Sequence, residues 1–213
     1  MGFNRLDEQR REMDGSVPSG NNGNAGAARR GQARNHTNQK MNAIEKAEML
    51  ANLESGRQAL IEAVSGVTED VALRRPGPGK WSVLECVEHL AVAEAYLLAQ
   101  VEGATRSEAP VVNAAREKAI VQRGLDRTKR VEAPDAAKPT GRFSTLKDAR
   151  DHFDATRART LKFVENCGED LRARLAHHPL IGTVNCYENL LIMAVHPHRH
   201  TKQIQEILET VGH

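Results

Sequence analysis

Apolar residues recur every three or four positions in four long segments of the chain, and this spacing is typical of amphipathic helices. The four segments are approximately residues 43–64, 82–101, 145–166 and 186–211. No stretch alternates apolar and polar residues for long enough to indicate a sheet. The pattern therefore predicts an all-α fold, a four-helix bundle with a long crossover between helices 2 and 3.

Punctuating residues mark the ends of these helices. Residues 76–79, Pro-Gly-Pro-Gly, cannot continue a helix and come just before the second one. Ser82, followed by Glu85 three residues later, has the capping-box pattern of a helix start. Trp81 is expected to anchor that start by packing. Gly168 lies where a glycine commonly ends a helix, directly after the third segment.

The connections between the helices are uneven in length. Residues 102–144 are polar and irregular, with one short helical candidate at 114–125. A segment of this length inside a domain is typical of a functional lid or of a crossover. A short helical turn is expected at 170–175. Residues 177–185, HHPLIGTVN, are predicted to form a loop, whose two histidines have either a role near a ligand or only a loop role.

Composition divides the chain into two parts. Residues 1–40 are predicted to be a disordered N-terminal tail, because the stretch GSVPSGNNGNAGAARRGQARNHTNQK is rich in Gly, Asn and Arg and has almost no large apolar residues. The helical pattern assigns residues 41–213 to one domain. The tail holds seven of the 30 Lys and Arg and four of the 28 Asp and Glu, which leaves 23 and 24 in the domain. The tail is either a basic arm for nucleic acid or an extension with no fold, and its scarcity of aromatics and of regularly spaced basic residues favours the second interpretation.

The cysteines and the apolar runs bear on the compartment. Cys86, Cys167 and Cys186 are scattered and form no CxxC pair, which favours a reducing, cytoplasmic setting. No apolar run reaches the roughly 20 residues of a membrane span. The N-terminus has no apolar signal-peptide region. We therefore expect a cytoplasmic protein with no membrane partner.

Three histidines are the strongest candidates for chemistry. His196 and His200 are four residues apart and share one face of the last helix. His89 lies on the inward stripe of the second helix. Neutral imidazoles bind divalent ions such as zinc or nickel. Three protein ligands with an open position are typical of a catalytic metal rather than a structural one.

This spacing has a plainer explanation as well. A single buried histidine is more often a core residue than a ligand, and a pair four apart arises by chance in a chain with nine histidines. Pro197 removes one backbone hydrogen bond and crowds the carbonyl of Met193, so a kink is expected between His196 and His200. His198 is displaced around the helix and is expected to be exposed.

Nearby polar residues have both a functional and a structural interpretation. Glu85 can orient His89 or act only in the capping box. Cys86 can be a fourth ligand or a buried core residue. Asn189 and Gln203 can line a pocket or simply make the helix surface polar. No residue stands out as a general acid or base, so the catalytic residues are not predicted.

Two segments resemble known motifs. PGPGKWSVLECVEHLAVAE is similar to the second-helix motif of the DinB-like superfamily, a Pro/Gly turn, then Trp-Ser, then a helix ending in His-Leu. HPLIGTVNCYENLLIMAVHPHRHTKQIQEI resembles that family's closing motif, a His-Pro/Gly loop followed by HxxRHxxQI. The resemblance implies a four-helix bundle, often a homodimer, with a divalent metal held by three histidines. These map onto His89, His196 and His200, while Pro197 departs from the expected pattern.

The resemblance also implies a class of activity. DinB-like proteins include enzymes that transfer low-molecular-weight thiols, thiol-dependent isomerases and some amide hydrolases. We therefore expect a metal-dependent thiol S-transferase or related hydrolase that uses zinc or nickel and acts on a small molecule, for example a low-molecular-weight thiol. The alternative is a non-catalytic metal-binding or stress-response protein of the same fold. The near-neutral domain argues against a nucleic-acid partner.

Overall fold

The computed structural model describes residues 41–129 and 131–212. The predicted tail, residues 1–40, lies outside the described residues. The helices are α1 (Ala43–Val64), α2 (Glu69–Leu73), α3 (Val83–Glu102), α4 (Ala114–Leu125), α5 (Leu146–Asn166) and α6 (Cys186–Val211), with short 3-10 turns at Asp135–Ala137 and Leu171–Ala173. The strands are β1 (Thr105–Arg106), β2 (Arg174–His178) and β3 (Gly182–Asn185).

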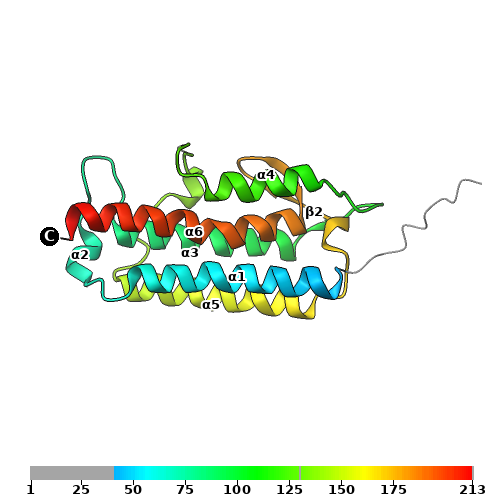
Figure 1. The fold of residues 1–213 in the computed structure, drawn as a ribbon, viewed down its shortest axis with the longest axis horizontal. Helices are drawn as coiled ribbons and strands as arrows, with labels where there is room; N and C mark the ends of the chain where they lie inside the picture. The colour runs from blue at the N-terminus through cyan, green and yellow to red at the C-terminus, as the bar shows by residue number, and fades with distance from the viewer. Residues whose placement is uncertain (1–40, 130, 213) are drawn as a thin grey trace, which may run out of the picture. The chain divides into compact units, whose positions relative to one another are not determined.

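Four long helices form the bundle, as the periodicity predicted. α1 packs against α5 and α6, and α3 packs against the same two helices from the opposite side. Figure 1 shows that α3 and α5 run in the same direction. The chain must therefore return along the bundle between them, and residues 103–145 form this crossover. α4 lies within it and packs along α6.

Side-chain caps explain why the helices begin where they do. Three of the four long helices start with a complete capping box: Asn42 with Glu45, Ser82 with Glu85, and Asn185 with Glu188. In each pair the two side chains satisfy two backbone N–H groups that the first helical turn leaves free. The predicted box at Ser82 is confirmed, and the boundaries of all four helices agree with the pattern to within one residue.

Two apolar clusters make up the core, one toward each end of the bundle. One includes Leu53, Leu98 and Leu190, and the other includes Leu60 and Phe153. Burial of these aliphatic side chains is the main driving force for bundle formation. Between the clusters, at mid-length of the bundle, lies a layer that contains buried charged side chains. This layer, rather than either cluster, lies level with the candidate site.

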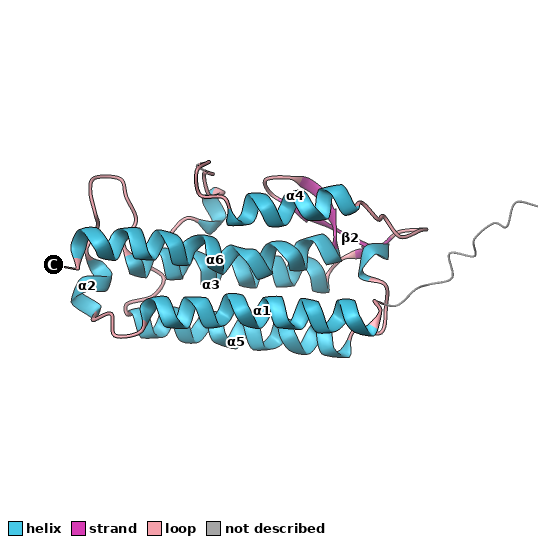
Figure 2. Cartoon of the chain, viewed as in Figure 1, coloured by secondary structure: helices cyan, strands magenta, loops and turns pink. Residues whose placement is uncertain are grey.

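A small sheet accompanies the predicted helical bundle, although no strands were expected from the sequence pattern. β2 and β3 form an antiparallel hairpin where a loop was expected at residues 177–185, and β1 of the crossover adds to β2 (Figure 2). The strands have two, five and four residues, too short for an alternating pattern. Gly182 begins β3 with φ 73°, the left-handed conformation that a tight turn needs.

The structure adds two smaller corrections. The turn expected at 170–175 is a 3-10 turn limited to Leu171–Ala173, after which β2 begins. The connection after α1 contains a short helix, α2, that was not predicted; Thr68 caps its start. Within the part of the chain that the structure describes, no helix is both long and apolar enough to cross a membrane.

Candidate metal centre

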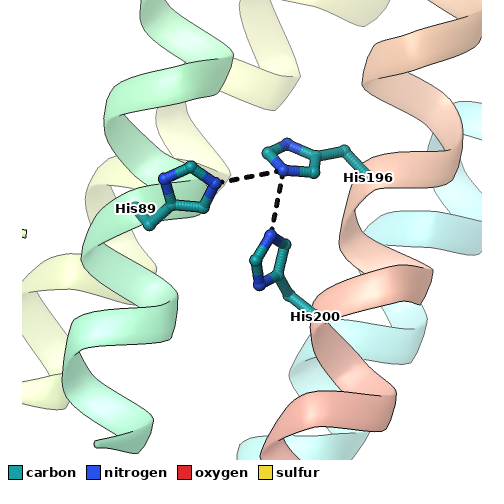
Figure 3. Close-up of side chains that lie close together, drawn as sticks. All are labelled: His89, His196 and His200. Carbon is teal, nitrogen blue, oxygen red and sulfur yellow. Dashed lines mark hydrogen bonds between the residues drawn. The ribbon is translucent and has the colours of Figure 1, made fainter. Parts of the chain in front are cut away.

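The three candidate histidines meet between α3 and α6 (Figure 3). His89 extends from α3, and His196 and His200 extend from successive turns of α6. The Nε2 atom of His196 lies 3.1 Å from that of His89 and 3.0 Å from that of His200. The potential ligand atoms of the three residues all lie within 4.8 Å of one another. The structure thus brings together the residues that sequence spacing suggested.

Hydrogen bonds at the outer nitrogens fix two of the tautomers. His89 Nδ1 lies 2.7 Å from the carbonyl oxygen of Ala137, which can only accept, so Nδ1 carries the proton. His200 Nδ1 lies 3.0 Å from Oε1 of Gln203, and Arg127 donates to the same oxygen at 3.1 Å. Because the guanidinium only donates, this atom is the amide oxygen and His200 Nδ1 must donate too. Both rings therefore direct an Nε2 lone pair at His196.

This arrangement fits a shared cation. A single N–H on His196 Nε2 can donate fully to only one of the two lone pairs, whereas a cation can accept all three nitrogens. Nitrogens that each lie about 2.0–2.1 Å from one ion in tetrahedral or octahedral geometry are about 2.9–3.4 Å apart. The separations of 3.0 and 3.1 Å match that range. Carbonyl or amide oxygens behind ligand histidines are also typical of metal sites.

Burial keeps the three imidazoles neutral. Desolvation lowers the pKa of His89, although its hydrogen bond to the Ala137 carbonyl acts in the opposite direction. Desolvation also holds the pKa values of His196 and His200 well below the usual value, and the neighbouring histidines lower them further. Neutral imidazole is the form that binds metal, so the fold removes much of the competition from protons.

Pro197 does not interrupt the helix that carries two of the histidines. α6 continues from Cys186 to Val211 through Pro197. Pro197 leaves the Met193 carbonyl without its usual helical donor. Nη2 of Arg157 on α5 donates to this oxygen at 2.8 Å. The buried guanidinium thus replaces the missing backbone N–H.

The crossover is tied to α3 beside the first histidine. The carboxylate of Glu88, which is buried, accepts hydrogen bonds from the backbone N–H groups of Thr140, Gly141 and Arg142 at 2.7, 3.1 and 3.2 Å. The next residue, His89, binds the crossover at Ala137. Adjacent residues of α3 therefore hold the crossover in place and orient the imidazole.

A large cavity opens beside the histidines. Its volume is about 1660 Å³, and its lining comes from residues 76–81 before α3, from α3, α4 and α6, from the end of β2 with the β2–β3 turn, and from the second half of the crossover. Trp81 lines it, with its ring 5.0 Å from that of His89 and stacked at 6.3 Å on that of His200. Sequence reasoning gave Trp81 a packing role only. Its position eight residues before His89, more than two helical turns, gave no sign that the ring lies against two of the histidines.

His178 belongs to the same cavity and was undervalued as a loop residue. It ends β2, and only 8% of its surface is exposed. Its Nδ1 accepts a hydrogen bond from the Leu180 backbone N–H at 3.2 Å, so the neutral ring carries its proton on Nε2. Burial, with a smaller effect of His177, lowers its pKa to about 4. His178 thus offers an N–H donor to a ligand in the cavity.

The remaining sequence candidates have varied outcomes. Gln203 lines the cavity and binds His200, whereas Asn189 is fully buried away from it. Glu85 does not orient His89; its carboxylate completes the capping box and pairs with the Arg75 guanidinium. Cys86 is a core residue outside the histidine group, and burial raises the pKa of its thiol.

One more position differs from expectation. His198 is half-buried rather than exposed, with Nε2 3.4 Å from the Ser55 hydroxyl on α1. Its ring therefore lies on the α1 side of α6, away from the other histidines of that helix.

Comparison with known proteins agrees with this fold. YfiT from Bacillus subtilis, described as having an unusual four-helix bundle topology, matches with 17% identity and a TM-score of 0.52 over 82% of this chain and 91% of its own. TT2238, described as a four-helix bundle protein, matches with 20% identity and a TM-score of 0.49 over 76% and 98%. No curated protein matches the sequence. The family model of the DinB superfamily matches residues 52–204, more than half of the chain, and the chain therefore belongs to the DinB superfamily.

Proposed function

We propose that this protein is a metal-dependent enzyme whose divalent ion is bound by Nε2 of His89, His196 and His200. One observation carries the proposal. The outer partners of two rings, the Ala137 carbonyl and the Gln203 amide oxygen, force their Nε2 lone pairs toward a single point that the third ring also faces. A purely structural histidine cluster does not require two lone pairs to meet in this way.

The chemistry follows from three neutral ligands beside a cavity. A bound divalent ion supplies a Lewis acid that lowers the pKa of a water or thiol nucleophile toward neutrality. The chain's own residues hold that reaction in place: Trp81 covers the site against bulk water, and His178 Nε2–H donates to an electronegative atom of the substrate. We propose zinc or nickel, since both accept imidazole nitrogens readily.

Two reaction classes suit this arrangement: transfer of a low-molecular-weight thiol to an electrophile, and hydrolysis. YfiT is described as a probable metal-dependent hydrolase, which supports the second class. We further propose that residues 41–213 act as one domain, that the protein is cytoplasmic and that it forms a homodimer. The free cysteines Cys86, Cys167 and Cys186 support the reducing setting.

Metal content tests the site. Purified wild-type protein, without a metal-binding tag, is expected to hold about one zinc or nickel ion per chain by mass spectrometry of the metals. His200→Ala should hold less than about one-tenth of that amount. His198→Ala is the matched control, because it removes a histidine two residues away on another side of α6, and it should retain the wild-type content. Equal metal in wild type and His200→Ala would overturn the proposal.

Activity tests the reaction. Zinc- and nickel-loaded protein is compared with metal-stripped protein in two assays, thiol transfer to a bimane electrophile and hydrolysis of a nitrophenyl ester. Turnover that requires the metal and is lost in His200→Ala supports the enzyme. Stoichiometric metal with no turnover across several thiols and esters would instead favour the non-catalytic metal-binding alternative.

A further inference from the structure

The cavity is far more positive than the domain that contains it. Residues 41–213 hold 23 Lys and Arg against 24 Asp and Glu, so the domain is close to neutral. Among the described residues that line the cavity, six are cationic and two are acidic. The cationic residues are Lys80, Arg116, Arg123, Arg127, Lys138 and Arg199; the acidic ones are Glu132 and Glu206. A cleft lined by one sign of charge attracts ligands of the opposite sign.

Most of these cations already have partners. Arg127 makes a two-pronged ion pair with Glu206 at 3.1 and 2.6 Å, and Lys138 binds Glu132 at 3.0 Å. Arg116 lies 3.4 Å from the buried carboxylate of Glu188, which is not part of the cavity lining. These charges are therefore neutralised within the fold and contribute little to ligand selection.

Three arginines line the cavity in and directly after α4. Arg116 and Arg123 lie two turns apart on one side of α4, with Ile120 between them, and Arg127 follows the end of the helix. The outer two have acidic partners. The guanidinium of the middle one, Arg123, has no hydrogen-bond or ion-pair partner among the described residues, although it lies between two paired arginines.

The helix that carries Arg123 is held firmly over the site. Arg199 on α6 donates to backbone carbonyls at the end of α4, those of Arg123, Asp126 and Lys129. Gly124 also lies so close to Val195 that a Cβ there would collide with the valine side chain. Because α4 is fixed at close range to α6, the backbone of Arg123 is held beside the cavity, and its exposed side chain lines the same cavity as the three histidines.

Apolar side chains form another part of the cavity wall. Four exposed large apolar residues of the described chain line this cavity: Tyr96, Val131, Leu180 and Ile181, with 37, 56, 50 and 41% of their surface exposed. Exposed apolar side chains gathered beside polar anchors are characteristic of small-molecule sites. The wall therefore suits a ligand with an apolar body.

We propose that the cavity binds a small organic carboxylate, with its apolar body against Tyr96 and Ile181 and its carboxylate on Arg123. This inference rests on the proposed function only for the identity of the group that reacts at the histidines. The contact between the carboxylate and Arg123 does not need the metal. The guanidinium fork matches a carboxylate with two parallel hydrogen bonds. Of the guanidinium groups in the lining, that of Arg123 is the one without a partner among the described residues, and one guanidinium matches one carboxylate; the ammonium of Lys80, on the connection before α3, is unpaired as well.

Trp81 provides the measurement, because it is the single tryptophan of the chain and lines the cavity. Its fluorescence is titrated with 4-phenylbutyrate, with 4-phenylbutan-1-ol and with 4-phenylbutylamine, which share one apolar body and differ in charge. Metal-stripped protein is used first, so that a carboxylate cannot bind through the ion. Wild type is expected to bind the carboxylate about tenfold more tightly than the alcohol and the amine most weakly.

Two variants isolate the arginine. Arg123→Gln should weaken carboxylate binding about tenfold, to the level of the alcohol, while leaving alcohol binding unchanged, which shows that the cavity is intact. Lys118→Gln is the matched control: it removes one charge from an exposed position of α4 that does not line the cavity. It should keep the wild-type preference.

The outcomes are separable from those of the metal test. Equal binding of carboxylate and alcohol by wild type, no binding of either, or a preference that survives Arg123→Gln would overturn the inference. A preference for the carboxylate that appears only in metal-loaded protein and is unchanged by Arg123→Gln would also overturn the inference, since the ion would then hold the carboxylate. Absence of bound metal from the purified protein would contradict the proposed function but would leave the titration of metal-free protein unchanged.

Discussion

Two buried polar clusters lie at mid-length of the same bundle, and they differ in how completely their members are paired. The ion-pair cluster, Glu94, Arg157 and Thr160, lies between the helices and is almost fully excluded from solvent. The histidine cluster lies between α3 and α6 beside the cavity. Both replace apolar core at the level where the two hydrophobic clusters end.

In the ion-pair cluster every prominent group has a partner. Arg157 Nε and Nη2 bind the two oxygens of Glu94 at 2.6 and 2.9 Å, and the Thr160 hydroxyl donates to the same carboxylate at 3.0 Å. The remaining guanidinium donors reach the carbonyls of Leu53 and Met193. The cluster is closed, so nothing is left to bind a ligand.

The histidine cluster is closed on its outer side and open on its inner side. The outer nitrogens of His89 and His200 have oxygen partners, while their inner lone pairs converge on His196 without a matching set of donors. A complete buried network specifies structure, whereas lone pairs that are held together without donors identify a binding site. The contrast makes predictions about stability and about metal affinity that can be separated.

The largest expected effect is on folding, from the closed cluster. Arg157→Met leaves the Glu94 carboxylate buried without its counter-charge and removes the donor to the Met193 carbonyl. The free energy of unfolding should fall by about 3–5 kcal/mol, measured by urea denaturation of metal-free protein. Replacing both partners, in Glu94→Leu with Arg157→Met, should recover much of that loss.

The comparison variant for this experiment is Arg57→Met. Its ion pair with Asp154 also joins α1 to α5, but 31 and 25% of the two side chains remain exposed, so the loss should stay below about 1 kcal/mol. A loss of similar size in both variants would show that the buried cluster is no more important to stability than a partly exposed pair.

The next effect concerns the open cluster. Gln203→Leu removes the oxygen that fixes the His200 tautomer, so metal affinity should fall about 10- to 100-fold, measured by competition with a chelator. Stability without metal should change little, because Gln203 is half-buried at the cavity wall. Gln205→Leu makes the same change at an exposed position of α6 and should leave affinity unaltered. Equal affinity in all three proteins would show that the tautomer is not set by Gln203.

Sequence reasoning identified the open cluster more readily than the closed one. His196 and His200 are four apart on a helix with an apolar stripe, and that local pattern is enough to bring them together. The long crossover was also visible, because a polar stretch between two periodic segments cannot belong to the bundle core. What periodicity cannot give is a partner from another segment: Ala137 of the irregular crossover orients the His89 ring, whereas Gln203, which orients the His200 ring, lies three residues further along the same helix.

Arg157 was missed although a signal existed. It falls one turn after Phe153 and shares the inward side of α5 with Ala149 and Thr160, so a charged residue interrupts an apolar stripe. Such an interruption indicates a buried ion pair. The sequence alone does not show which residue of α3 is the partner of Arg157, because that depends on how the helices pack. Packing also decides what satisfies the Met193 carbonyl that Pro197 leaves without a backbone donor: its partner, Arg157, comes from another helix and could not be read from the sequence.

A smaller effect is expected from pH. The pKa of His178 is about 4 in the fold and 6.5 without burial, so the unfolded chain binds more protons between these values. This contribution to stability is complete above pH 6.5 and is lost as the pH falls toward 4. After allowance for screening by cavity solvent, it amounts to roughly 1–2 kcal/mol.

The experiment measures urea unfolding of metal-free protein across that pH range. His178→Gln, which cannot take up the proton, should reduce the change in the free energy of unfolding across this pH range by that amount. His177→Gln, at the exposed neighbouring position, should not. A steeper dependence in His178→Gln than in wild type would contradict the lowered pKa.

The smallest single effect is expected at Pro197, where the two clusters meet. Arg157 already donates to the Met193 carbonyl, so the backbone N–H introduced by Pro197→Ala has little to satisfy. The free energy of unfolding should change by less than about 1 kcal/mol, and metal affinity should stay within about threefold of wild type.

The same substitution becomes informative when the donor from α5 is absent. In the Arg157→Met background, Pro197→Ala gives the Met193 carbonyl its helical donor back, so it should recover about 1 kcal/mol of the free energy of unfolding. The coupling between the two positions is read from the double-mutant cycle. Equal effects of Pro197→Ala in both backgrounds would mean that Arg157 does not compensate for the proline, and that the closed cluster supports the open one only through general packing.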